Sequence, residues 1–106
     1  MNPEVAARFH EKSKGINALC DACGVERLEL FGSGTGENWK PGESDVDLLV
    51  CFRAPRRAGI ADDYLRLAEG LEALLGCRVD LLTDESVRNP YFRTAVERTR
   101  EPVYAS

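Results

Sequence analysis

The sequence predicts an α/β fold with few strands, and three observations support this prediction. The segment 45–52, Asp-Val-Asp-Leu-Leu-Val-Cys-Phe, is a short apolar run typical of a buried strand. From Tyr64 to Leu75, apolar residues recur at three- and four-residue spacing, which indicates an amphipathic helix. Segments of the two kinds alternate along the chain, and this alternation favours an α/β sandwich.

The first part of the chain is predicted to form a helix and a short strand. Asn2 can cap a helix with Pro3 at its first position, because proline has a fixed φ angle and no N–H to satisfy. Apolar residues at helical spacing carry this helix to Gly24, a natural stop, and we expect Gly15 to weaken or bend its middle. The pattern then changes to a short strand over residues 27–31.

The second part of the chain supplies the remaining elements. The amphipathic helix is expected to stop at Gly76, and residues 78–82 read as a third strand. Asn89 and Pro90 open a final helix, which Pro102 ends. The expected order is therefore helix, strand, glycine loop, strand, helix, strand, helix.

Length and composition favour a small globular protein. With 106 residues, we expect one domain spanning residues 1–106 around one modest core. Hydrophobic residues make up 43% of the chain and charged residues 30%, and no apolar run reaches the ~20 residues that a membrane helix needs. Because residues 1–14 are charged throughout and lack the apolar core of a signal peptide, we expect a cytoplasmic protein.

The charge balance limits the partners. A net charge of −4 excludes the strongly basic surface that nucleic-acid binding uses, so direct nucleic-acid binding is not expected. An anionic substrate would therefore need metal ions or backbone amides to bind. We interpret the four cysteines as reduced thiols, since an even cysteine count without a secretion signal does not indicate a disulfide scaffold.

Three carboxylates are the candidate catalytic and metal-binding groups. Asp45 and Asp47 lie two apart on the predicted strand, so both side chains leave one face of the sheet, with Cα atoms about 6.5–7 Å apart. Asp80 stands between Val79 and Leu81 in the third strand, and we expect it in apolar surroundings on that same face. Converging carboxylates repel one another unless a divalent cation compensates, and hard oxygen ligands favour Mg²⁺ or Mn²⁺. A lone Asp-x-Asp is, by contrast, more often a pair of solvated acids at the start of a strand.

Residues 32–36, Gly-Ser-Gly-Thr-Gly, follow a predicted strand directly. Glycines let backbone N–H groups approach a phosphate, because no Cβ blocks the approach. The P-loop motif is absent, since no Gly-Lys-Ser/Thr follows, and so is the dinucleotide motif G-x-G-x-x-G. A plain glycine-rich turn is the alternative to a phosphate-binding loop.

Taken together, the loop and the acids resemble the signature of the DNA polymerase β-like nucleotidyltransferase superfamily, in particular its minimal nucleotidyltransferase (MNT) domains. The resemblance extends over nearly the whole chain, in the segments 30–33, 44–50, 79–82, 88–92 and 103–105. Eleven residues separate Ser33 from Asp45, where many members have ten. Gly34-Thr35-Gly36 also stands where many members carry arginines, and this departure concerns the binding of the triphosphate.

The resemblance implies a small polymerase β-like α/β fold, with a few-stranded mixed sheet and helices, and a metal-dependent transfer of a nucleoside monophosphate. It implies that Asp45 and Asp47 bind two Mg²⁺ ions, with Asp80 completing the site. Gly32 and Ser33 would hold the triphosphate of ATP or another NTP. The implied acceptor is a hydroxyl, a tyrosine on a HEPN-type partner protein that the chain neutralises as its antitoxin.

Two alternatives remain open at this stage. One is a non-catalytic binding module that silences its partner by complex formation, and the other is a nucleotide-sensing domain without turnover. The small size of the chain and the missing arginines after Ser33 favour the first of them. The preferred nucleotide, the acceptor and the oligomeric state, whether homo- or hetero-oligomer, are not determined by the sequence.

The other conspicuous side chains are interpreted as packing or solvated surface. Cys20 and Cys23 have the spacing of half a zinc site, but the second half is missing, so we expect two semi-buried thiols. Tyr91 and Phe92 are expected to be core residues or a partner surface. The remaining residues of this group are His10, Trp39, Lys40, Arg53, Arg56 and Arg57.

Overall fold

The structure is a computed structural model of the chain and describes residues 1–53 and 59–106. In these ranges four strands form one mixed sheet in the order β3-β2-β1-β4. β2 runs parallel to β3, and β1 runs antiparallel to β2 and to β4. The strands are β1 (Val25–Phe31), β2 (Val46–Phe52), β3 (Val79–Thr83) and β4 (Glu101–Ala105).

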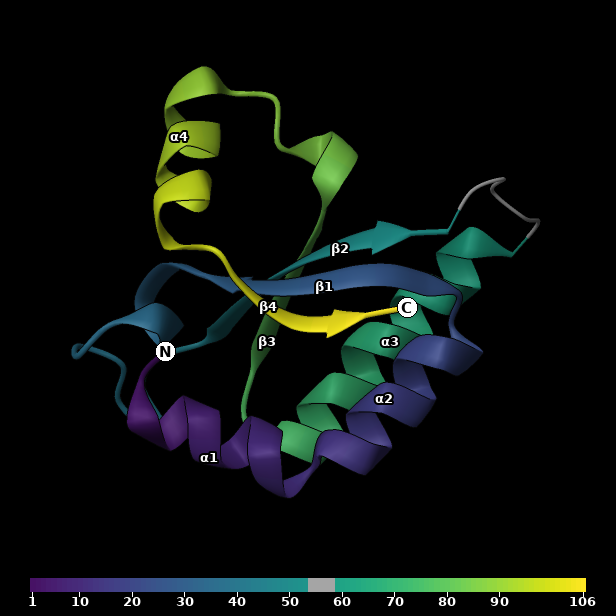
Figure 1. Cartoon of the computed structure of the whole chain (residues 1–106), viewed down its shortest axis with the longest axis horizontal. Coiled ribbons are helices and arrows are strands. Elements are labelled where there is room, and N and C mark those ends of the chain that lie inside the picture. The colour runs from purple at the N-terminus through teal and green to yellow at the C-terminus, as the bar shows by residue number, and fades with distance from the viewer. Residues whose placement is uncertain (54–58) are drawn as a thin grey trace.

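The helices divide between the two faces of the sheet. Three of them cover one face, and α4 stands on the other (Figure 1). Two short 3₁₀ helices follow β1 and β3. The bounds are α1 (Pro3–Glu11), α2 (Ser13–Ala22), η1 (Gly32–Thr35), α3 (Ile60–Leu75), η2 (Asp84–Ser86) and α4 (Pro90–Thr99). The predicted α/β class with a few-stranded mixed sheet is confirmed.

The main core lies between the sheet and the three helices α1, α2 and α3. As predicted, Val46, Leu48 and Val50 of β2 are buried on this side, because alternate residues of a strand face the same way. They pack with the apolar stripe of α3, which includes Leu67 and Leu71. The helix ends at Leu75, and Gly76 follows it with φ of +68°, as expected of a glycine stop.

The N-terminal helix differs from the prediction. It breaks at Lys12 into α1 and α2, and Gly15 does not bend it. Gly15 instead lies inside α2 against α3, where a Cβ would be 2.8 Å from Leu74 Cδ2. The glycine therefore serves the close approach of two helices, a role that periodicity along one segment cannot reveal.

The C-terminal segment holds a strand that the sequence did not predict. Residues 101–105 form β4 beside β1, with Pro102 opposite Glu29 at an irregular register. Proline was predicted only to end α4, but it is tolerated here because β4 is an edge strand and a missing N–H costs least at an edge. Within the described ranges, none of the helices is both long and apolar enough to cross a membrane.

Replacing Leu48 by alanine should destabilise the chain by about 2–5 kcal/mol, because a fully buried leucine of the central strand leaves a cavity. Leu65→Ala is the matched control, since Leu65 is 56% exposed, and it should cost less than about 0.5 kcal/mol. Urea unfolding measures both values. Equal losses for the two variants would contradict this placement of the core.

Candidate active site

Asp47 and Asp80 lie side by side on the face of the sheet that carries α4. They are register partners in the parallel pair of β2 and β3, and Asp47 is also opposite Phe31 of β1. Register partners on adjacent strands point to the same face, so Phe31, Asp47 and Asp80 form one row across three strands. The prediction that Asp80 shares a face with Asp47 is confirmed, but Asp80 is exposed and not enclosed in apolar surroundings.

Asp45 lies immediately before β2, and the guanidinium of Arg78 balances the charge of its carboxylate. The Nε atom of Arg78 is 3.0 Å from Asp45 Oδ1, with the arginine side chain 73% and the aspartate side chain 43% exposed. The indole Nε1 of Trp39 donates a hydrogen bond of 3.0 Å to the Asp45 carbonyl, which anchors the backbone here. An exposed ion pair of this kind is worth at most about 1 kcal/mol, so another cation can displace Arg78 readily.

The charges of the acids act on one another. Burial, and after it the nearby carboxylates of Asp80 and Asp45, together raise the pKa of Asp47 to about 6. The ionised form of Asp47 is therefore disfavoured as the site stands. A divalent cation relieves both causes, since it replaces lost hydration and screens the repulsion.

The metal site expected at Asp45, Asp47 and Asp80 stays a prediction. Among the described residues, no three histidine, cysteine, aspartate or glutamate side chains lie close enough to hold an ion as they stand. Arg78 pairs with the Asp45 carboxylate, whereas Asp47 and Asp80 are register partners on β2 and β3. The oxygen donors and their mutual repulsion still suit Mg²⁺ or Mn²⁺ chemically.

Gly32 is fitted against the Asp47 carboxylate. Its φ angle is +70°, and a Cβ at this position would lie 2.6 Å from Asp47 Oδ2. Its N–H donates a hydrogen bond of 3.0 Å to the Thr99 hydroxyl of α4. Glycine is required here both by the left-handed backbone and by the approach of the acid. Ser33 follows it as an exposed residue, so the loop begins directly beside the acids.

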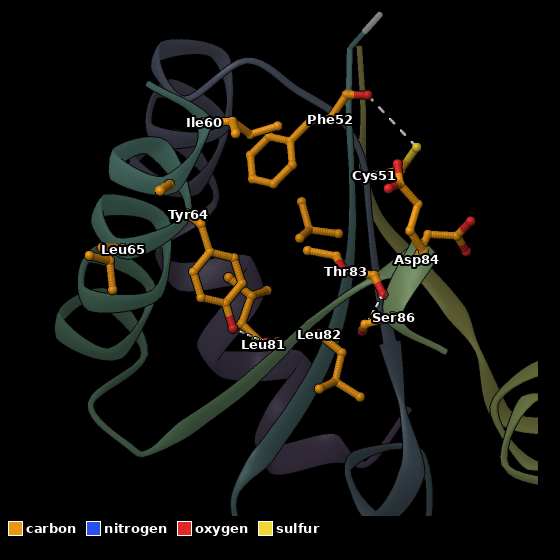
Figure 2. Close-up of a pocket in the computed structure, with 13 residues that line it drawn as sticks. Cys51, Phe52, Ile60, Tyr64, Leu65, Leu81, Leu82, Thr83, Asp84 and Ser86 are labelled. Carbon is orange, nitrogen blue, oxygen red and sulfur yellow. Dashed lines mark hydrogen bonds between the residues drawn. The ribbon is translucent and has the colours of Figure 1, made fainter. Parts of the chain in front are cut away.

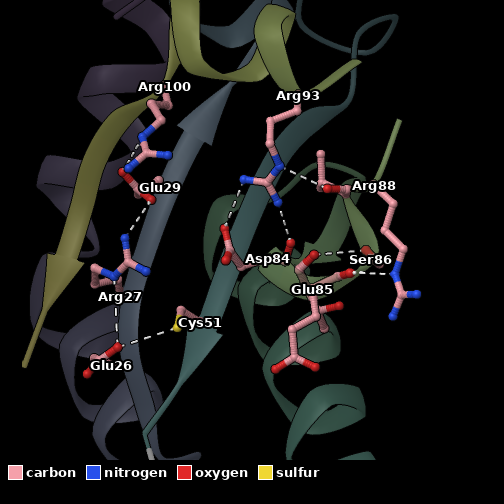
Figure 3. A network of polar contacts seen from close by, with 12 residues as sticks. Glu26, Arg27, Glu29, Cys51, Asp84, Glu85, Ser86, Arg88, Arg93 and Arg100 are labelled. Atoms are coloured by element: carbon pink, nitrogen blue, oxygen red, sulfur yellow. Dashed lines mark hydrogen bonds and ion pairs between the residues drawn. The ribbon is translucent and has the colours of Figure 1, made fainter. Parts of the chain in front are cut away.

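The helix α4 is clamped over this face by arginines (Figure 3). Arg93 Nε donates to the Val87 carbonyl at 2.9 Å, and its Nη2 donates to the Asp84 carbonyl at 2.8 Å. Arg100 pairs with Glu29 of β1 at 3.2 Å. These contacts hold α4 to the segment after β3 and to β1.

The two aromatic residues at the start of α4 differ in their surroundings. Phe92 packs edge-on against Phe31, with ring centroids 6.0 Å apart. Tyr91 is 87% exposed, so it is not a core residue. A partner surface at Tyr91 stays a prediction.

The other sequence candidates lie away from the acids. Cys20 and Cys23 are buried, more deeply than expected, and burial together with the nearby Cys23 raises the pKa of Cys20 to about 12. Trp39 is buried beneath Arg8, as expected of loop packing. Arg53 pairs with exposed Asp21. His10 and Lys40 are exposed, and Arg56 and Arg57 lie outside the described residues.

A separate apolar cavity of about 580 Å³ lies at the other end of β2 (Figure 2). It runs between α3 and the ends of β2 and β3, where the Tyr64 hydroxyl donates a hydrogen bond to the Leu81 carbonyl. None of the candidate acids or loop glycines lines it. Asp47 stands near the start of β2, so the cavity is distinct from the acid site.

Sequence reasoning missed Arg78 and the second role of Asn2. The parallel register of Val46 with Val79 places the preceding residues, Asp45 and Arg78, next to each other, but this register is not visible in the sequence. Asn2 was predicted as a helix cap. It also binds the glycine loop, by hydrogen bonds of 2.9 Å to the carbonyls of Gly34 and Gly36.

Residues 12–102 match the family model described as a nucleotidyltransferase domain. The chain belongs to this family. It is 40% identical over 80 residues to a candidate protein adenylyltransferase of Methanocaldococcus jannaschii, MJ1379, covering 74% of this chain and 77% of that one. It is 38% identical over 86 residues to the protein adenylyltransferase MntA of Thermococcus cleftensis, covering 81% and 80%. The chain is thus a nucleotidyltransferase enzyme related to the MntA-type proteins.

Solved structures agree with this placement. A candidate minimal nucleotidyltransferase superposes with a TM-score of 0.71 at 31% identity, covering 96% of each chain. A complex of a tri-AMPylated HEPN toxin with its MNT antitoxin, from Shewanella oneidensis, matches with a TM-score of 0.58 at 17% identity, over 95% of this chain and 72% of that one. The second likeness shows the fold alone.

Gly32→Ala should destabilise the chain more than Gly42→Ala. Both glycines have positive φ angles, but a Cβ meets nothing within 4 Å at Gly42 and meets Asp47 Oδ2 at 2.6 Å at Gly32. The strain costs about 1–2 kcal/mol at each position, and the clash adds about 1–3 kcal/mol at Gly32 only. Denaturant unfolding measures the difference, and Asp47→Ala should recover part of the loss in Gly32→Ala. Additive effects in that double variant would rule out the contact.

Asp47→Asn should stabilise the metal-free chain at pH 8 and have little effect at pH 4. The folded pKa of about 6 lies above the unfolded value near 3.8. Between these values the unfolded state has lost the proton and the folded state still holds it, so stability falls as pH rises through the window and stays lower above it. Melting curves of both proteins in EDTA measure this. A difference in melting temperature that is equal at pH 4 and pH 8 would contradict the raised pKa.

Proposed function

We propose that this nucleotidyltransferase moves AMP from ATP to a hydroxyl of a HEPN-type partner protein, in a reaction that needs two Mg²⁺ ions. The observation that carries the proposal is the row formed by Asp47 and Asp80 beside the Gly32 loop. The names of the relatives support the reaction, since several are protein adenylyltransferases or candidates for that activity. The fold neighbours support the partner, since several of them are complexes of toxin and antitoxin.

Each site residue has a role in this proposal. Asp45, Asp47 and Asp80 hold the metal ions, and Gly32 with Ser33 holds the triphosphate. When bound, the ions supply a lowered pKa for the acceptor hydroxyl and charge neutralisation for the leaving group. Asp80 is exposed, so it is accessible to an acceptor and is the candidate for receiving the hydroxyl proton.

The proposed AMP transfer is an in-line substitution at the α-phosphorus of ATP. The acceptor oxygen forms a bond to the α-phosphorus of ATP, and the bond from that phosphorus to the bridging oxygen breaks. Pyrophosphate leaves, and the hydroxyl proton passes to a carboxylate and then to solvent. The loop at Gly32 and the acid row lie on one end of the sheet, which suits a substrate that must reach both.

A HEPN-type partner protein that is incubated with this chain, Mg²⁺ and ATP labelled in the α-phosphate should become labelled. EDTA should abolish labelling, and Asp47→Asn should reduce its rate at least about 100-fold, because a displaced or missing metal ligand removes the main electrostatic contribution. Asp62→Asn is the control, since Asp62 is exposed on α3 away from the site. If the single variants Asp45→Asn and Asp47→Asn each transferred label at the wild-type rate, the proposal would be overturned.

One observation favours a second candidate function, a module that neutralises its partner by binding. Arg78 pairs with Asp45 at 3.0 Å, so this acid is compatible with a purely structural role. In that case a variant with both Asp45→Asn and Asp47→Asn would still protect cells that co-express the partner. Loss of protection in this variant, with the complex still formed, would favour the transferase. ATP binding without turnover would instead point to a nucleotide-sensing domain.

A further inference from the structure

Asn2 connects the N-terminal helix to the glycine loop. Its Oδ1 accepts hydrogen bonds from the N–H groups of Glu4 at 2.9 Å and Val5 at 3.3 Å, which caps α1. Its Nδ2 donates to the Gly36 carbonyl at 2.9 Å, and its backbone N–H donates to the Gly34 carbonyl at 2.9 Å. The residue is only 7% exposed, so all four bonds are sheltered from competing water.

A second helix of the chain shows that capping alone does not require this arrangement. Asn89 precedes Pro90 as Asn2 precedes Pro3, and its Oδ1 accepts from the N–H groups of Tyr91 at 2.9 Å and Phe92 at 3.3 Å. These distances match those at α1. Asn89 is exposed, however, and among the described residues its Nδ2 donates no hydrogen bond. The loop contacts are therefore a feature of Asn2 beyond the cap.

The hydrogen bonds from Asn2 determine which backbone groups of the loop, C=O or N–H, face outward. The carbonyls of Gly34 and Gly36 point to Asn2. In a trans peptide the C=O and the following N–H point in opposite directions, so the N–H groups of Thr35 and Glu37 are directed away from Asn2. Carbonyl oxygens carry partial negative charge and repel a phosphate, whereas N–H groups attract it.

The rest of the loop leaves little freedom for another arrangement. Gly34 is buried against Leu30, where a Cβ would lie 3.0 Å from Leu30 Cδ1. The Thr35 hydroxyl donates to the Gly32 carbonyl at 2.7 Å. Gly32 itself is set against Asp47, so an orientation fixed by Asn2 at the far end of the loop is transmitted to the acid site.

We propose that Asn2 is a positioning residue for the nucleotide. It turns the carbonyls of the loop 32–36 inward, so that the loop meets the triphosphate without their repulsion. This inference rests on the proposed function in one respect, that the loop binds the triphosphate of ATP. Asn2 acts through the loop and touches no reacting atom.

The test compares Asn2→Ser with Asn89→Ser. Serine caps a helix about as well as asparagine, but its side chain is too short to cap α1 and also reach the Gly36 carbonyl. Asn2→Ser should raise the KM for ATP about 5–10-fold, the loss expected of one hydrogen bond of about 1–1.4 kcal/mol, with kcat within about twofold. Asn89→Ser should leave KM unchanged. A KM that is the same in both serine variants would overturn the proposal.

Asn2→Asp is the second variant, because it keeps the size and the capping oxygen, replaces the amide donor by an acceptor oxygen and adds a negative charge beside the loop. It should raise KM at least as much as Asn2→Ser, with Asn89→Asp as its control. Amide hydrogen exchange gives a reading that needs no activity. The Gly36 N–H donates to the Ser33 carbonyl at 3.1 Å, and its exchange should be about tenfold faster in both Asn2 variants and unchanged in the Asn89 variants.

ATP binding by the wild-type chain and the behaviour of the Asn2 variants distinguish a failure of the proposed function from a failure of the role of Asn2. A wild-type chain that binds no ATP by calorimetry overturns the proposed function, and with it the role of Asn2 toward a triphosphate. A wild-type chain that binds ATP, with KM unchanged in both Asn2 variants, overturns the role of Asn2 alone. Unchanged exchange at Gly36 in both Asn2 variants also overturns it, because the loop is then held without this side chain.

Discussion

Asp47 Oδ2 occupies the space beside Gly32 that any larger residue at position 32 would fill, and so the acid and the glycine loop cannot be placed independently. The antiparallel pairing of β1 with β2 sets this approach, since it puts Phe31 opposite Asp47. The parallel pairing of β2 with β3 then brings Asp80 to the other side of Asp47. Through strand register, one close contact thus fixes the loop and two of the three acids. The same parallel register places the third acid, Asp45, beside Arg78, and the two side chains form an ion pair.

The site is held at an electrostatic cost. Burial and like charges raise the pKa of Asp47, which means that ionising this side chain costs more free energy in the folded chain than in the unfolded chain. Such a cost is typical of functional sites, where stability is lost in exchange for a group that responds to a cation or a substrate. Arg78 offsets part of it at Asp45 only. The hydrophobic core on the other face of the sheet, with Leu28, Leu30 and Leu48 fully buried, supplies the stability that the acid row lacks.

Local signals predicted the elements that depend on neighbouring residues. Proline after asparagine marked the start of α1 and α4, and glycine marked the end of α3, because caps and turns are decided within a few residues. The break at Lys12 and the strand β4 were missed. β4 contains a proline and exists because β1 offers it an edge, so its pairing partner lies about 75 residues away in sequence and leaves no local pattern.

The sequence by itself determined the chemistry of this protein: a Gly-Ser loop after one strand, an Asp-x-Asp at the start of the next and a third aspartate in a later strand. Residue type and spacing carry that information because the proposed transfer needs carboxylates and a loop backbone without Cβ atoms. Only the tertiary structure decided which groups meet. The register of β2 and β3 set Asp80 beside Asp47 and Arg78 beside Asp45, and the docking of α1 brought Asn2 to the loop. These contacts join residues far apart in the chain, and their distances depend on packing that no single segment encodes.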